Sequence, residues 1–194
     1  MYKVAVLMAT YNGERYLEEQ LQSILAQQGV ELTIWVRDDG STDSTHQILD
    51  AWKEKGCLDW YTGSSLGPAH SFMDLLQTAP DADFYAFSDQ DDYWLPGKLQ
   101  VAVSCLTSAH ERGEECLYFC QTQLVDKELN FLPSPQLNLR QTFAEALIYQ
   151  FIGGNTMVLN HRLRSVLNSY KAEYVCMHDV WIYDVAMAIR AYVH

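Results

Sequence analysis

The chain is poor in basic residues and has no long hydrophobic run. Among its 194 residues, lysine and arginine number 13 and aspartate and glutamate number 25, so the formal net charge is −12. An acidic chain gains nothing from the phosphate attraction that drives general nucleic-acid binding, and we therefore expect no nucleic-acid partner. No apolar run approaches the roughly 20 residues of a membrane-spanning helix, whereas peripheral association with a membrane surface stays open.

Cysteine is scarce and irregularly placed. The five cysteines are odd in number, and Cys116 and Cys120 form the only close pair. Without a second pair the pattern does not complete a zinc site, so reduced thiols in a reducing compartment are the better interpretation. The chain also opens without the charged and then apolar segments of a signal peptide. We expect a cytoplasmic protein, with a place at the inner face of the cell membrane as a further option.

The residues that are present have the composition and the periodicity of a folded α/β domain. Hydrophobic residues make up 48% of the chain and charged residues 20%, as in globular proteins. Apolar and β-branched runs alternate with helical spacing in the first half, which predicts strands at 3–9, 32–36, 58–61 and 84–87 and helices at 14–28, 44–55 and 70–77. This order predicts an α/β fold with a mainly parallel central sheet flanked by helices.

The second half is less regular. Its patterns predict strands at 117–120 and 156–159, a loop at 130–138 that carries two prolines, and helices at 142–149 and 180–192. With no internal repeat and no low-complexity segment, the chain is expected to form a single domain.

Three polar segments each follow a predicted strand, at 10–13, 38–43 and 89–92. Because ligands bind beyond the carboxyl ends of the strands in such sheets, we expect all three segments at the same edge. The segment 89–92 holds three carboxylates within four residues, whose mutual repulsion a cation would offset. Oxygen ligands beside a phosphate suit Mg²⁺ or Mn²⁺. A solvated acidic turn is the alternative interpretation.

The other polar segments also have two interpretations each. Residues 38–43 are typical of a strand-to-helix turn, yet two aspartates before the glycine exceed what a turn needs, and one could accept a nucleobase N–H. Residues 9–14 open a helix, where backbone N–H groups favour polar ligands, although Tyr11 there could simply pack. Asp179 could cap a helix start or act as a general base that deprotonates a hydroxyl.

Five segments together resemble the family 2 glycosyltransferases, whose nucleotide-binding fold is called GT-A. In chain order they read ATYNGERYL, VRDDGSTDST, FSDQDDYWLPGKL, GGNTMVLN and MHDVWI. The resemblance implies one catalytic domain over 1–194, with a nucleotide-binding half at 1–110 and an acceptor-side half at 111–194. Many members carry a further histidine beyond the last matching helix. Since this chain ends at His194, we expect it to be truncated at its C-terminus.

The resemblance also implies roles for individual residues. Asp179 matches the catalytic base, and Asp91 matches the last aspartate of the family's Asp-x-Asp motif and hence the ligand of a divalent cation, Mn²⁺ or Mg²⁺. The residues implied to bind the nucleotide are Thr10, Tyr11, Asn12, Asp39 and Asp89. The residues implied to lie in the donor or acceptor region are Asp92, Gly153, Gly154, Asn155, His178 and Trp181. His178 stands where many members have a glutamate.

The implied activity is an inverting transfer of a sugar from a UDP- or dTDP-linked donor to the hydroxyl of a saccharide or lipid-linked saccharide. The His-Asp pair followed by Trp181 is similar to bacterial enzymes that transfer rhamnose or related sugars in surface polysaccharide assembly. Two alternatives remain. A sugar nucleotidyltransferase would also use carboxylates and a metal, but it usually needs a glycine-rich basic loop near its N-terminus. A non-catalytic module that binds nucleotide sugars would need no general base.

Overall fold

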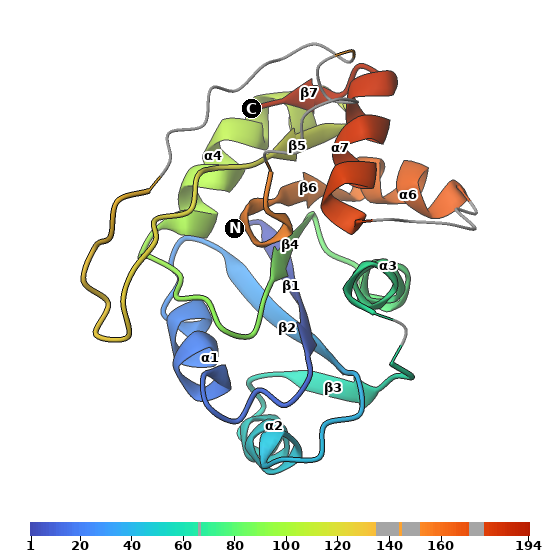
Figure 1. Ribbon diagram of the computed structural model, residues 1–194. Coiled ribbons are helices and arrows are strands. Elements are labelled where there is room, and N and C mark those ends of the chain that lie inside the picture. The colour runs from blue at the N-terminus through green and yellow to red at the C-terminus, as the bar shows by residue number, and fades with distance from the viewer. Residues whose placement is uncertain (66, 135–143, 145–151, 171–176) are drawn as a thin grey trace.

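The computed structural model describes residues 1–65, 67–134, 144, 152–170 and 177–194 (Figure 1). Within these residues seven strands form one sheet in the order β3-β2-β1-β4-β6-β5-β7. The strands are β1 (Lys3–Thr10), β2 (Glu31–Asp38), β3 (Asp59–Thr62), β4 (Phe84–Ser88), β5 (Cys116–Tyr118), β6 (Val158–Asn160) and β7 (Tyr192–Val193). The central strands are short runs of apolar residues because both of their faces are covered by helices.

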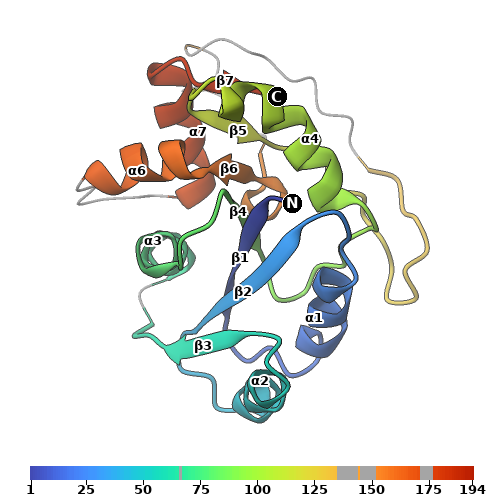
Figure 2. The same cartoon turned by 180° about the vertical axis from the view of Figure 1, so that it is seen from behind.

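Helices pack on both faces of this sheet (Figures 1 and 2). One face carries α1 (Leu17–Leu25), α2 (Thr45–Glu54) and α4 (Lys98–Glu111), and the other carries α3 (Pro68–Thr78), α6 (His161–Ser169) and α7 (His178–Ala188). The alternation of side chains along β1 separates the two cores, since Val4, Val6 and Met8 join the first set of helices and Ala5 and Leu7 join the second. The predicted α/β sandwich of a sheet between helices is therefore confirmed.

The parallel register brings the carboxyl ends of the first strands together. Thr10 at the end of β1 pairs with Asp38 at the end of β2, and Met8 pairs with Ser88 at the end of β4. The β1, β2, β3 and β4 pairs are all parallel, as is β5 with β7, whereas β6 runs antiparallel to both β4 and β5. The sheet is therefore mainly parallel, as expected, with one reversed strand in its second half.

The structure corrects several predicted elements. Helices α4 and α6 were not expected from the sequence, and the helix predicted at 14–28 spans only Leu17–Leu25. The helix predicted to reach residue 192 is wrong at its end, because Arg190 takes a left-handed φ of 59° and Tyr192 then joins strand β7. Thr156 lies in a 3₁₀ turn, η1 (Gly154–Thr156), rather than in the strand predicted from it. The helix predicted at 142–149 lies outside the described residues, apart from residue 144.

Among the described residues, no helix combines the length and the apolar character that crossing a bilayer requires.

Candidate active site

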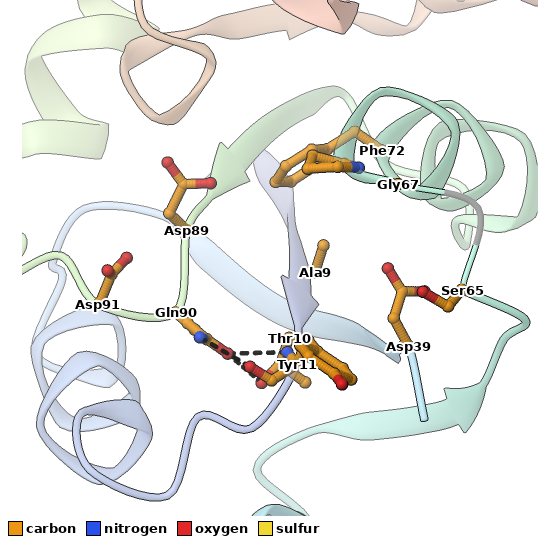
Figure 3. A pocket seen from close by; sticks show the side chains of 11 residues that line it. Ala9, Thr10, Tyr11, Asp39, Ser65, Gly67, Phe72, Asp89, Gln90 and Asp91 are labelled. Carbon is orange, nitrogen blue, oxygen red and sulfur yellow. Dashed lines mark hydrogen bonds between the residues drawn. The ribbon is translucent and has the colours of Figure 1, made fainter. Parts of the chain in front are cut away.

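A pocket opens at the carboxyl edge of the parallel strands. Its volume is about 280 Å³, close to the lower end of the range for small-molecule sites. The residues that line it come from the end of β1 and from the segments that follow β1, β2, β3 and β4: Ala9, Thr10, Tyr11, Asp39, Ser65, Gly67, Pro68, Phe72, Asp89, Gln90 and Asp91. Figure 3 shows Asp39 on one wall and Asp89 and Asp91 on the opposite wall, with Ala9 between them. The three polar segments therefore meet at one edge, as predicted.

Hydrogen bonds hold the loop after β1 against the loop after β2. The backbone N–H of Asn12 donates to Ser41 Oγ at 2.8 Å, and Asn12 Oδ1 accepts from the Thr42 N–H at 2.9 Å. The Gly13 N–H donates to Thr45 Oγ1 at 2.8 Å. Asn12 has a left-handed φ of 49°, a conformation that asparagine tolerates better than most residues. Its contacts thus go to the neighbouring loop, and its contact with a nucleotide stays a prediction.

The adjacent aspartates of the second loop have different surroundings. Asp38 is fully buried and accepts hydrogen bonds from the Gly40 and Ser41 N–H groups, the Ser41 hydroxyl and the His46 ring. Burial acts to raise the pKa of Asp38, but the hydrogen bonds from Ser41, His46 and Gly40 outweigh it and hold that pKa below its usual range. Asp38 therefore shapes the turn, and Asp39 is the aspartate that faces the pocket.

Three groups fix Asp39 in place. Its backbone N–H donates to the Thr10 carbonyl at 2.9 Å, the Arg37 guanidinium donates to Oδ1 at 2.8 Å, and the Ser71 hydroxyl donates to Oδ2. Tyr11, a residue that is 55% exposed, also lines the pocket. A planar ring next to a fixed hydrogen-bond acceptor suits a flat heterocycle with an N–H group.

The acidic loop after β4 concentrates negative charge. Burial, and then the charges of Asp92, Asp91 and Asp179, raise the pKa of Asp89 to about 6. Burial also raises the pKa of Asp92, and a hydrogen bond from Asn155 Nδ2 at 2.6 Å opposes that shift. Asp91 is the exposed member of the group. Because Asp179 contributes to the shift of the Asp89 pKa, its carboxylate also lies close to this loop.

Lys98 and Gln90 are two residues of this site that the sequence did not single out. The Lys98 ammonium donates to the Asn155 carbonyl at 2.6 Å and lies 3.7 Å from the centre of the Trp94 ring. Gln90 Oε1 accepts from the Thr10 hydroxyl at 2.6 Å and from the Tyr11 N–H at 2.9 Å, and its Nε2 donates to the Tyr11 carbonyl at 3.1 Å (Figure 3). Gln90 and Lys98 lie inside the segment FSDQDDYWLPGKL, but no local pattern predicts these long-range contacts.

The residues predicted to lie on the acceptor side adjoin the pocket through α3 and η1. Asp179 is buried in the first turn of α7, where its Oδ2 accepts from the Gly154 N–H at 3.2 Å and its Oδ1 from the Val180 N–H at 2.8 Å. The His178 ring stacks on Phe72, which lines the pocket, with 4.2 Å between ring centres. Gly153 and Asn155 flank Gly154, so the segment predicted near the donor or acceptor does border the acidic loop.

Two further predicted residues have structural contacts. Burial lowers the pKa of His178 to about 4, so its ring is neutral at neutral pH, and neither ring nitrogen has a hydrogen-bond partner among the described residues. Trp181 lies one turn further along α7, partly buried, with the edge of its ring toward Tyr170 at 6.5 Å.

The donor set fits a divalent cation that is shared with a ligand. Among the described residues, no group of three or more His, Cys, Asp or Glu side chains could hold a metal ion by itself. Carboxylate oxygens are nevertheless the ligands that Mg²⁺ and Mn²⁺ prefer, and Mg²⁺ typically combines one or two of them with phosphate oxygens and water. The excess negative charge around Asp89 is the observation that favours a cation here.

Comparison with known proteins gives consistent results. Residues 5–170 match the family model described as Glycosyl transferase family 2. The dTDP-rhamnosyl transferase RfbG of Shigella flexneri is 28% identical over 200 residues, which cover 92% of this chain and 64% of RfbG. The chain therefore spans less than two thirds of the length of that relative.

Solved structures show the same fold. A crystal structure of Staphylococcus aureus TarS 1–349 in complex with UDP-GlcNAc has a TM-score of 0.74 at 22% identity, covering 98% of this chain and 55% of that one. The mannosyltransferase PcManGT from Pyrobaculum calidifontis, in complex with GDP-Man and Mn²⁺, has a TM-score of 0.72 at 20% identity, covering 98% of this chain and 53% of that one. The central sheet with flanking helices is the GT-A fold.

Proposed function

The chain belongs to glycosyl transferase family 2, and from that premise we propose that it is an inverting glycosyltransferase that moves a sugar from a nucleotide diphosphate donor to an acceptor hydroxyl. One observation carries the proposal. A single pocket has a fixed hydrogen-bond acceptor, Asp39, on one wall and the carboxylates of Asp89 and Asp91 on the other. This arrangement suits a molecule with a heterocycle at one end and a cation-bound diphosphate at the other.

The nucleoside lies, in this proposal, between Tyr11 and Asp39. Tyr11 offers an exposed ring face, Thr10 closes the base of the pocket, and Asp39 accepts a base N–H. Asp89 approaches the ribose, and Asp91 contributes the carboxylate that binds Mn²⁺ or Mg²⁺ together with the diphosphate. When bound, such a cation stabilises the charge on the departing nucleoside diphosphate. Asp92 accepts a hydrogen bond from Asn155 and thereby orients the acidic loop after β4.

Asp179 is the proposed general base. It removes the proton of the acceptor hydroxyl while that oxygen attacks the anomeric carbon from the face opposite the diphosphate. One displacement inverts the anomeric configuration, through a transition state with oxocarbenium character. The backbone N–H groups of Gly154 and Val180 orient the carboxylate. Gly153, Gly154 and Asn155, with His178 and Trp181 behind them, form the donor and acceptor side.

The substrates belong to the synthesis of a cell-surface polysaccharide. The name of RfbG specifies dTDP-rhamnose chemistry and the TarS complex contains UDP-GlcNAc, so a UDP- or dTDP-sugar donor is the preferred choice. The acceptor is a saccharide or a lipid-linked saccharide. One catalytic domain over residues 1–194 then works in the cytoplasm, at the inner face of the membrane where such acceptors are assembled.

A thermal-shift screen of nucleotide sugars with and without Mn²⁺ tests this function. We expect a rise in melting temperature that needs both Mn²⁺ and a pyrimidine diphosphate sugar, and that is lost in Asp91→Asn. Asp179→Asn should keep the shift and lower transfer roughly 100-fold or more, because it removes the base and keeps the shape. Metal-dependent binding with no donor hydrolysis or transfer would favour a binding module. Release of pyrophosphate from a nucleoside triphosphate would favour a nucleotidyltransferase.

A further inference from the structure

Arg37 is a buried cation that the proposed reaction does not use. It sits on β2 two residues before Asp39, and only 2% of its side chain is exposed. Its Nη1 donates to Asp39 Oδ1 at 2.8 Å, its Nε lies 3.1 Å from Asp74 Oδ2, and its Nη2 donates to the Ser64 carbonyl at 2.7 Å. Burial of an arginine is costly unless charged partners compensate. Three polar groups therefore hold Arg37 in the protein interior, which distinguishes it from an arginine in a surface ion pair.

The backbone is shaped to admit the guanidinium. A Cβ atom at Gly63 would overlap the Arg37 guanidinium carbon and two of its nitrogens. Gly63 also donates its N–H to the Asp38 carbonyl at 2.8 Å, and Ser65, two residues on, lines the pocket. Arg37 thus joins the wall formed after β3 to the carboxylate that follows β2.

Among the described residues, the partners of the Asp39 carboxylate leave it with open acceptor positions toward the pocket. Each carboxylate oxygen can accept about two hydrogen bonds. Arg37 occupies one position on Oδ1 and Ser71 occupies one on Oδ2, while the carboxylate still lines the cavity (Figure 3). A carboxylate that is bonded on both oxygens cannot rotate to suit a different ligand. The group is therefore a rigid acceptor rather than an adaptable one.

We propose that Arg37 and Ser71 are positioning residues that set nucleobase specificity by holding Asp39 as a rigid acceptor. This inference rests on the proposed function, in which the pocket binds the nucleoside. Uracil and thymine present an N–H at N3, whereas cytosine presents a lone pair there. One cation faces two carboxylates, Asp39 and Asp74, so the subsite keeps an excess of negative charge. The subsite therefore accepts the N3–H of uracil or thymine and repels the N3 lone pair of cytosine.

The test measures the affinities of UDP and CDP by calorimetry in Mn²⁺, because the two ligands share ribose and diphosphate. The wild type should prefer UDP. Arg37→Lys keeps the charge and loses the planar fork, and should lower the UDP/CDP affinity ratio about tenfold by weakening UDP alone. Ser71→Ala releases the other oxygen and should lower the ratio about threefold. In an Asp39→Asn background, Arg37→Lys should leave the ratio unchanged, since its effect passes through that carboxylate.

Arg164→Lys is the matched control for loss of a partly buried arginine. Arg164 binds the carbonyls of Leu76, Gln77 and Ala79 at the end of α3, away from the pocket. The Arg164→Lys variant should have a lower melting temperature than the wild type and an unchanged UDP/CDP affinity ratio. A wild-type ratio in both Arg37→Lys and Ser71→Ala overturns the inference, and if Arg37→Lys does not fold, the ratio in Ser71→Ala decides. If the wild type binds none of UDP, dTDP and CDP, the proposed function itself is overturned.

Discussion

At the scale of single residues, Asp89 has a side chain whose ionised form lowers the stability of the folded chain. Its pKa is raised to about 6 by burial and by the charges of Asp92, Asp91 and Asp179. A carboxyl whose pKa is higher in the folded than in the unfolded chain binds more protons when folded. The free energy of unfolding therefore falls as pH rises from about 4 to about 6. At neutral pH the ionised group carries the full cost.

Asp89→Asn should remove that cost. In the absence of metal and nucleotide, we expect the variant to be more stable than the wild type by on the order of 2 kcal/mol at pH 7, after allowance for the partial exposure of Asp89. The gain should shrink as pH falls toward 4. Urea denaturation at several pH values measures the difference, in which the groups that do not interact with Asp89 cancel. Equal stability of the two proteins at pH 7 would contradict this account of Asp89.

Gln90 offers a second prediction, about the alignment of two loops. Its amide bonds the Thr10 hydroxyl and both backbone groups of Tyr11. Gln90→Met keeps the length of the side chain and removes all three bonds, so Tyr11 and the acidic loop should lose their relative alignment. We expect nucleotide affinity to fall about tenfold. The exposed Gln47→Met on α2 is the control, and a calorimetric affinity equal to the wild type in Gln90→Met would exclude the role.

The sequence anticipates some of these residues and not others. Asp39 and Asp91 could be found because a carboxylate after a strand of a parallel sheet has an expected location. Arg37, Gln90 and Lys98 could not, since their partners lie far along the chain or depend on a turn that only the folded structure defines. The role of Arg37 needs the position of Ser64, and no local pattern supplies that.

At the scale of elements, η1 and the start of α7 form one packed unit. A Cβ atom at Gly154 would collide with the His178 ring, and the Gly154 N–H donates to Asp179. Gly154→Ala should therefore displace the first turn of α7 and with it the proposed base. We expect a loss of about 1–3 kcal/mol in stability and a larger fall in transfer than in nucleotide binding.

Removal of the imidazole provides the control for Gly154→Ala. The double variant Gly154→Ala/His178→Ala has room for the added methyl group, so transfer should recover relative to Gly154→Ala alone. Calorimetry and a transfer assay on Gly154→Ala, His178→Ala and the double variant measure this. Additive losses in the double variant would mean that the ring and the methyl group do not interact.

The predicted elements succeed where local pattern decides and fail where packing decides. Strands β1 and β4 are fully recognisable because buried strands between helices are continuous apolar runs. Helix α6 buries only Leu163 and Leu167, which is too few for a visible period. Strand β7 has two residues and exists because Tyr192 reaches the Glu115 carbonyl. The helical end of α7 is set by the backbone of Arg190, a residue with no preference for that conformation.

At the scale of the whole molecule, Lys98 links the two halves of the chain. It donates to the Asn155 carbonyl, and Asn155 in turn donates to Asp92. Lys98→Met should change stability little, because burial lowers the pKa of Lys98 to about 8 and this cost of the buried charge offsets the bond to Asn155. It should reduce transfer more than nucleotide binding, since the acceptor side is released. Lys53→Met, which removes an exposed ion pair with Asp59, is the control. An equal loss of transfer activity in Lys98→Met and Lys53→Met would refute the link between the two halves.

The reversed strand β6 has a consequence for how this architecture can diversify. Because β6 is antiparallel to β4 and to β5, β5 ends and β6 begins at the edge where the pocket opens. The connection between β5 and β6 therefore leaves and rejoins the sheet at the edge where the proposed catalytic carboxylates lie. Insertions or deletions there alter no strand pair of β1 to β4. Under the proposed function, a lineage could alter the part of this connection that precedes η1 to accept new acceptors, while the loops proposed to bind the nucleotide keep their positions.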